Sequence, residues 1–110
     1  MLKFYQYTSK PMSQDAVRVA PEIYKVSLEN DAVRVLEVRM KQDAKSGMHS
    51  HPRCVAIVLN DQRLKFTFPD GKSDIVDLKR GQAIWLHPVS HSVENMGTQD
   101  ADGVVVELKR

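Results

Sequence analysis

Turn signals recur along the chain at intervals of roughly 8–12 residues, and this spacing constrains the fold more than any other feature of the sequence. The clearest signals are Asn30-Asp31, Asn60-Asp61, Pro69-Asp70-Gly71 and Lys79-Arg80-Gly81. In Pro69-Asp70-Gly71 the proline presets its own φ and the glycine accepts a positive φ, which suits a hairpin. Helical periodicity of useful length and internal repeats are both absent from the sequence. The spacing therefore predicts an all-β domain, built as an antiparallel sandwich, barrel or jelly roll.

Apolar runs fill the intervals between these turns. Most of them alternate apolar with polar residues, as half-buried strands do. The run at 54–59 is apolar throughout, which is typical of a buried strand. We predict about eight or nine short antiparallel strands in two sheets. The strands are placed at 22–28, 33–40, 54–59, 63–68, 75–78, 82–86, 90–93 and 103–108.

The chain of 110 residues has the length of one domain. Residues 1–20 are interpreted as an N-terminal arm and residues 21–110 as the single domain. The arm carries an aromatic cluster of Phe4, Tyr5 and Tyr7, which we expect to pack against the domain or, alternatively, to make dimer contacts. A short helical turn is predicted at 12–19.

The composition excludes several classes of protein function. The single cysteine excludes a disulfide framework within the chain, a cysteine-rich zinc module and an iron–sulfur site. The 16 Lys and Arg are interleaved with 14 Asp and Glu, so we expect no nucleic-acid partner. No apolar run approaches the roughly 20 residues of a membrane span, so we expect no membrane partner. The first residues contain no apolar segment typical of a secretory signal, and we expect a cytoplasmic protein.

Three of the four histidines stand in two short segments that can bring them together. His49 and His51 are separated by one residue, so on a strand both side chains point to the same face. His91 lies on another predicted strand. Imidazole nitrogens are common ligands of transition metals, and we predict a metal site formed by these three residues. The alternative is that His49 and His51 are exposed polar residues at a strand end.

These segments resemble the two sequence motifs of the cupin superfamily. His49-Ser50-His51 matches the H-x-H core of the first motif, and Gly81, His91 and Asn95 match the second. The segment 64–71 is similar to the hairpin that separates the motifs in cupins.

The resemblance covers most of the chain after residue 30, and it extends to small single-domain bacterial cupins, some of them associated with β-alanine degradation. It implies a cupin jelly roll, in which two antiparallel sheets enclose a central cavity that takes a small-molecule ligand or substrate. It also implies a homodimer, because cupins often pair subunits through sheet edges.

The chain departs from the cupin motifs in both halves. Asp43 stands where the first motif has a glycine. His87 and Val89 stand where the second motif has a proline and a glycine, and we expect Pro88 to supply the bend instead. No carboxylate occupies the position of the glutamate ligand, which falls at Cys54, Val55 or Ala56.

The missing glutamate changes the chemistry that the resemblance implies. Three neutral imidazoles leave a divalent ion its full charge, which favours anionic chelating substrates and open coordination positions. Such a site resembles that of cupin dioxygenases acting on β-diketones or small thiols. Nitrogen ligands suit Fe(II), which we favour, and also Zn, Ni or Cu, but suit Mg and Ca poorly.

Other residues have two interpretations each. Cys54 is interpreted as a small buried residue, with a fourth metal ligand as the alternative. His87 is either a surface residue or a pocket residue that supports the site through a hydrogen bond. Asn95 is expected to satisfy backbone groups near the end of its strand. Glu37 is expected to form an exposed pair with Arg39, with a general base inside the barrel as the alternative.

Four large side chains are candidates to line a pocket, although such residues in a β-barrel more often belong to the hydrophobic core. They are Met40, Phe66, Phe68 and Trp85.

Three functions follow from these observations. The first is a metal-dependent enzyme resembling a non-haem Fe(II) dioxygenase that acts on a small chelating substrate. The second is a non-enzymatic cupin module that binds a metal or a small molecule. The third is a degenerate cupin that serves only as a dimeric interaction domain.

Overall fold

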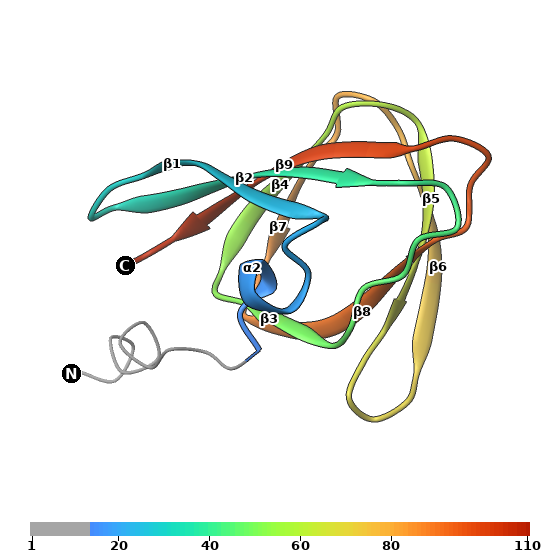
Figure 1. Ribbon diagram of the computed structural model, residues 1–110, viewed down its shortest axis with the longest axis horizontal. Coiled ribbons are helices and arrows are strands. Elements are labelled where there is room, and N and C mark those ends of the chain that lie inside the picture. Colours follow the sequence, from blue (N-terminus) through green and yellow to red (C-terminus); the bar gives the residue numbers. More distant parts are fainter. Residues whose placement is uncertain (1–13) are drawn as a thin grey trace.

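The computed structural model describes residues 14–110, which form two antiparallel sheets that enclose an interior space (Figure 1). One sheet has five strands in the order β1-β2-β9-β4-β7, and the other has four in the order β3-β8-β5-β6. The elements in chain order are α2 (Ala16–Val19), β1 (Tyr24–Glu29), β2 (Val33–Met40), β3 (His49–His51), β4 (Cys54–Val58), β5 (Gln62–Thr67), β6 (Ser73–Leu78), β7 (Ala83–Leu86), β8 (Val89–Asn95) and β9 (Ala101–Leu108).

The predicted all-β fold of eight or nine strands in two sheets is confirmed, at nine strands within the described residues. The additional strand is β3, the histidine segment itself, which is only three residues long. The hairpin predicted at Pro69-Asp70-Gly71 joins β5 to β6, and Gly71 has the positive φ of 89° that favours glycine there. Among residues 14–110, no helix is long and apolar enough to cross a membrane.

The five-stranded sheet is built around β2 and β9, which pair along their whole length from Val33–Leu108 to Met40–Ala101. Side chains alternate across β2: Leu36 and Met40 are buried, whereas Glu37 and Arg39 face solvent. Glu37 is therefore exposed as expected, but the predicted pair with Arg39 is wrong. Arg39 instead bonds Asp102 of the neighbouring strand β9 at 3.0 Å.

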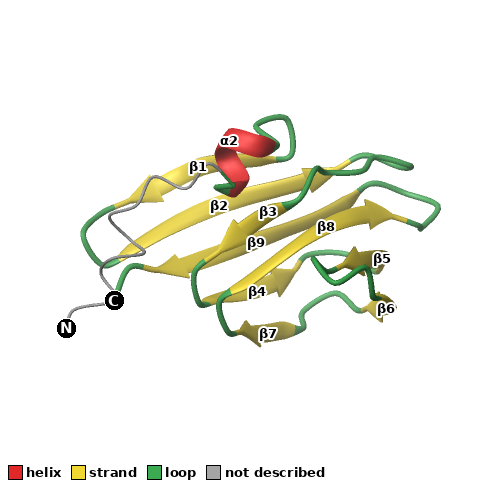
Figure 2. Cartoon of the chain, turned by 90° about the horizontal axis from the view of Figure 1, so that it is seen from below, coloured by secondary structure: helices red, strands yellow, loops and turns green. Residues whose placement is uncertain are grey.

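The short helix α2 lies between β1 of one sheet and β3 of the other (Figures 1 and 2). Its first turn is capped by Asp15, whose side chain accepts a hydrogen bond from the Val17 amide. Ala16 and Ala20 are buried in the main core. The helical turn predicted at 12–19 is thus present, and it packs onto the domain. The aromatic cluster of the predicted arm lies outside the described residues.

Two residues at positions of the cupin motifs have a left-handed backbone. Asp43 has a φ of 67°, the left-handed conformation that a glycine at this motif position would adopt easily. Gly81 has a φ of 92°, so the glycine of the second motif is required by its backbone. The chain bends at Pro88 between β7 and β8, as expected from the replacement of the motif residues on either side.

Candidate metal centre

His49, His51 and His91 meet because of the register between β3 and β8. The strands are antiparallel, with His49 directly opposite His91 and His51 opposite Val89. Residues two apart share a face of a sheet, so the three side chains project into the space between the sheets. The residues are 0%, 5% and 5% exposed, respectively. Each offers a ring nitrogen, and these nitrogens all lie within 4.8 Å of one another, a group that could bind a metal ion.

Hydrogen bonds fix the orientation of two of the three rings. The Nδ1 of His49 donates to the carbonyl oxygen of Gly47 at 2.9 Å. The Nδ1 of His51 bonds Oε2 of Glu107 at 2.7 Å. A carbonyl or carboxylate oxygen can only accept, so each Nδ1 carries a proton, and in the neutral form of an imidazole the lone pair is then on Nε2. Metal-binding histidines are commonly held by such partners.

Two of the three rings carry no positive charge that would repel a cation at neutral pH. Burial lowers the pKa of His49 to about 4, although the bond to Gly47 opposes this and the nearby His51 adds to it. Burial lowers the pKa of His91 to about 3, with further lowering by His51 and His49. Both rings are therefore neutral at pH 7, and their nitrogens are able to donate electron pairs to a metal. The donor set fits a divalent transition metal.

A carboxylate is present next to the histidines, although none stands at the motif position. It bonds the Nδ1 of His51 and is not part of the histidine group. Glu107 on β9 is 3% exposed. It bonds His51 and also Arg34, whose Nη2 lies 2.7 Å from Oε1 of Glu107. Arg34 reaches on to Asp15 at 2.6 Å, so a chain of charges connects the capping residue of α2 to His51. The sequence alone does not place Glu107 at the site, because its position next to His51 depends on the pairing of β9 with β2 and β4. The one sequence signal is a glutamate that interrupts an apolar strand.

Tyr24 is a second functional candidate that the sequence did not reveal. Its side chain is buried, and its hydroxyl lies 3.2 Å from Nε2 of His49. That nitrogen holds a lone pair, so the hydroxyl donates. Burial, followed by the charge of Glu107 and then Cys54, raises the pKa of Tyr24 well above its ordinary value. The phenol therefore stays protonated and remains a donor.

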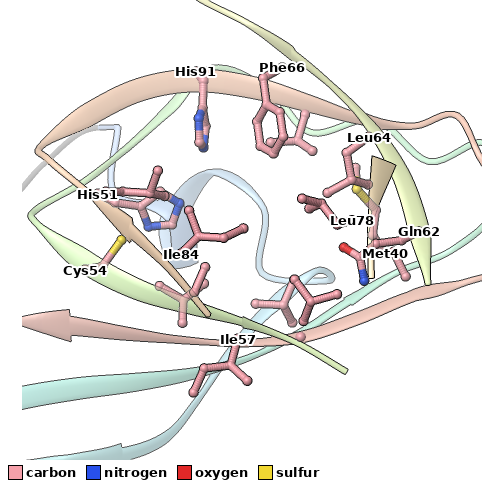
Figure 3. Close-up of a pocket in the computed structure, with 18 of the residues that line it drawn as sticks. Met40, His51, Cys54, Ile57, Gln62, Leu64, Phe66, Leu78, Ile84 and His91 are labelled. Atoms are coloured by element: carbon pink, nitrogen blue, oxygen red, sulfur yellow. The ribbon is translucent and has the colours of Figure 1, made fainter. Parts of the chain in front are cut away.

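A cavity of about 330 Å³ opens beside the histidines, between the two sheets (Figure 3). His51 and His91 line one end of it. The predicted wall residues Met40, Phe66 and Phe68 also line it. Its volume lies at the small end of the range of about 300–1,000 Å³ typical of small-molecule sites.

The structure does not place Trp85 or His87 in this cavity. The prediction of Trp85 as a wall residue is therefore wrong, whereas His87 is a surface residue, the first of its two interpretations. Trp85 is 49% exposed, and its ring packs edge-on to that of the exposed His87, with 6.3 Å between ring centroids. The reason is strand alternation on β7: Ile84 and Leu86 point into the cavity, so Trp85 between them points out. His87 follows β7 on the same surface.

Cys54 is buried and lines the cavity, but it is not part of the histidine group. Burial, and then the charge of Glu107, raises the pKa of its thiol to about 12. A protonated thiol is a poor ligand, so the structure agrees with the interpretation of Cys54 as a small buried residue.

Asn95 acts on the backbone, as expected, at the end of β8. Its Nδ2 donates to the carbonyl oxygens of Met40, Lys41 and Gln99, at 2.9–3.2 Å. Its Oδ1 accepts from the Gly97 amide at 2.9 Å. The residue thus joins the end of β2 to the loop between β8 and β9, and it does not line the cavity.

No protein-family model matches the chain, and no curated protein matches it. Solved structures, by contrast, match the chain. A cupin domain from Bordetella pertussis Tohama I has a TM-score of 0.74 and 28% identity, over 80% of this chain and 93% of that one. A conserved Klebsiella pneumoniae protein with a double-stranded β-helix domain has a TM-score of 0.65 and 19% identity, over 99% and 89%.

An RmlC-like cupin from Methanocaldococcus jannaschii has a TM-score of 0.63 and 11% identity, over 78% of each chain. These neighbours share the double-stranded β-helix, and the three-histidine cluster of the present chain fits a cupin site. The chain therefore has the double-stranded β-helix fold of these cupin domains.

Proposed function

We propose that the protein binds a divalent transition metal through His49, His51 and His91 and acts on a small chelating substrate, as a non-haem Fe(II) dioxygenase does. One observation supports this above all. Three imidazole nitrogens converge within 4.8 Å of one another at one end of an apolar cavity. An Fe(II) ion held there would supply open coordination positions and electrons for reaction with dioxygen.

The surrounding residues have separate tasks in this proposal. Gly47 and Glu107 hold the rings of His49 and His51 through their Nδ1 atoms, so that each Nε2 faces the metal position. Tyr24 would lose its acceptor when the His49 lone pair is used by a metal, so its hydroxyl would become available to donate to a bound substrate. The apolar wall excludes water from the reacting groups.

The second candidate is a non-enzymatic module that binds a metal or a small molecule. It is favoured by the cavity lining, which contains no Asp, Glu or Lys that could serve as a general base within the described chain. The two candidates share the metal site and differ in whether a bound molecule is converted.

Metal analysis tests the metal site that both candidate functions share. Protein loaded anaerobically with Fe(II) and desalted should retain close to one ion per chain. His49→Ala and His91→Ala should lose it, because each removes a ligand. His87→Ala is the matched control, since His87 is exposed and outside the site. Iron retained equally by all three variants, or by none including the wild type, would overturn the proposal. Oxygen uptake with β-diketones and small thiols then separates enzyme from binder.

We also propose a homodimer. The outer strands of the two sheets are β1, β7, β3 and β6. Exposed apolar side chains lie on three of these strands: Leu28 on β1, Ile75 on β6 and Trp85 on β7. Unpaired strand edges with apolar side chains favour association with a second copy. Sedimentation velocity should give a dimer, and a monomer at micromolar concentration would contradict this.

A further inference from the structure

We propose that the cavity selects a molecule made of three parts: a chelating head, an uncharged apolar body, and a hydrogen-bond donor at the far end that Gln62 recognises. The assignment of the head rests on the proposed metal site. The assignments of the body and the far end rest on the cavity alone.

The body must be uncharged because nothing in the cavity wall can neutralise a charge. Apart from the histidines and Tyr24, the lining is almost entirely aliphatic and aromatic, and no Asp, Glu, Lys or Arg lines the cavity within the described chain. A charged group placed there would lose its hydration without gaining a partner. A negative charge is tolerated only at the end that a metal would occupy.

Gln62 is the polar residue at the opposite end of the cavity from His51 and His91 (Figure 3). Its Nε2 donates to the backbone oxygen of Asn60 at 3.2 Å, to Oδ1 of Asn60 at 3.0 Å and to the backbone oxygen of Asp102 at 3.0 Å. Oδ1 of Asn60 is itself identified as an oxygen, because it accepts from the Asp102 amide. All three partners are acceptors, so the Gln62 amide has only one satisfactory orientation.

This orientation turns the Gln62 oxygen away from those partners. No donor bonds it among residues 14–110, and no buried side-chain polar atom in that range lacks a partner. The oxygen is therefore accessible rather than sealed by protein atoms. A rigidly held acceptor at the end of an apolar cavity suits a ligand that carries a hydroxyl or amine there.

The direct test uses zinc-loaded protein, in which the ion is redox-inert, and isothermal titration calorimetry. The probes are straight-chain carboxylates from butanoate to decanoate, their ω-hydroxy counterparts and the matching α,ω-dicarboxylates. Affinity for the plain series should rise about three- to fourfold for each methylene until the cavity is full. Dicarboxylates should bind at least about a hundredfold more weakly than monocarboxylates of equal length. Affinity independent of chain length, or dicarboxylates binding as well as monocarboxylates, would overturn the assignment of the body.

The far end is tested by comparing ω-hydroxyoctanoate with octanoate. In the wild type the two should bind within about threefold of each other, because the bond to Gln62 offsets the desolvation of the hydroxyl. In Gln62→Leu the hydroxylated probe should lose about tenfold relative to octanoate. Gln99→Leu is the matched control, since Gln99 also tethers a neighbouring loop, through Asp61, but lies outside the cavity. A relative affinity unchanged in Gln62→Leu, or changed equally in the control, would refute the role of Gln62.

Failure of the metal site can be told apart from failure of this inference. Zinc content is measured on the same samples, and octanol and its α,ω-diol are titrated into metal-free protein. Gln62→Leu should weaken the diol relative to octanol there too, whether or not zinc binds. If zinc is absent and this difference persists, only the proposed function fails. If zinc binds and the difference is missing, the recognition by Gln62 fails.

Discussion

At the scale of single residues, the most informative side chain is Glu107, which bonds the ring of His51 from behind. Glu107→Gln keeps the size of the side chain but removes the charge that orients and polarises the imidazole. We expect metal affinity to fall about 10- to 100-fold, the usual effect of losing such a partner. Competition with a chromogenic chelator measures it. Glu37→Gln, on an exposed position, serves as the control. Equal affinity in both variants would show that Glu107 only ties β9 to Arg34.

The buried histidines also predict how stability depends on pH in the metal-free protein. His49 and His91 titrate at about 4 and about 3 when folded, against about 6.5 in an unfolded chain. Below pH 6.5 the unfolded chain takes up protons that the folded protein does not. Above pH 6.5, these two histidines should therefore cause no change in the free energy of unfolding with pH. As the pH falls toward 4 it should decrease by up to about 1.4 kcal/mol per pH unit for each histidine.

Urea unfolding at a series of pH values measures this dependence. His91→Gln should flatten the slope between pH 6.5 and 4, and His87→Gln, at an exposed position outside the cluster, is the control substitution. A slope that is the same in wild type and His91→Gln would contradict burial of a neutral His91.

At the scale of elements, the turn at Asp43 has a left-handed backbone at the position where the cupin motif has a glycine. An L-residue with a φ of 67° carries a cost that aspartate tolerates and a β-branched residue does not. We expect Asp43→Val to lower the free energy of unfolding by about 1–2 kcal/mol. Asp43→Gly should leave it unchanged or raise it. Chemical unfolding of both variants is the measurement, and equal loss in the two would show that the aspartate side chain, rather than φ, matters.

The elements also show what could be read from the sequence and what could not. Turn spacing predicted the strands, because turns and alternation are local properties of the chain. The three histidines came from a local pattern combined with a family resemblance. Glu107 and Tyr24 could not be found in this way, since they reach the site only through β9 and β1 of the opposite sheet. Trp85 faces away from the cavity because it alternates with Ile84 and Leu86, so the local sequence does contain the information that places it outside.

At the scale of the whole molecule, the candidate metal centre lies where the two sheets meet. His51 of β3 bonds Glu107 of β9, and Tyr24 of β1 bonds His49 of β3, so each of these contacts joins one sheet to the other. A metal held by His49, His51 and His91 would bind the folded protein and not the separated strands. Free metal at a hundredfold excess over its Kd should therefore raise the free energy of unfolding by about 2.7 kcal/mol.

Thermal unfolding in the presence of zinc and after chelation measures this gain. Zinc should raise the Tm of wild type and of His87→Ala by several degrees, reversibly on addition of chelator. It should leave His49→Ala and His91→Ala unmoved, because neither retains the full ligand set. Since these sheet-joining contacts include no residue of the β5–β6 hairpin, hydrogen exchange should slow on zinc binding in β3, β8 and β9 more than in that hairpin. Uniform protection of all strands, or a Tm gain that survives the loss of His91, would mean that zinc stabilises the protein elsewhere.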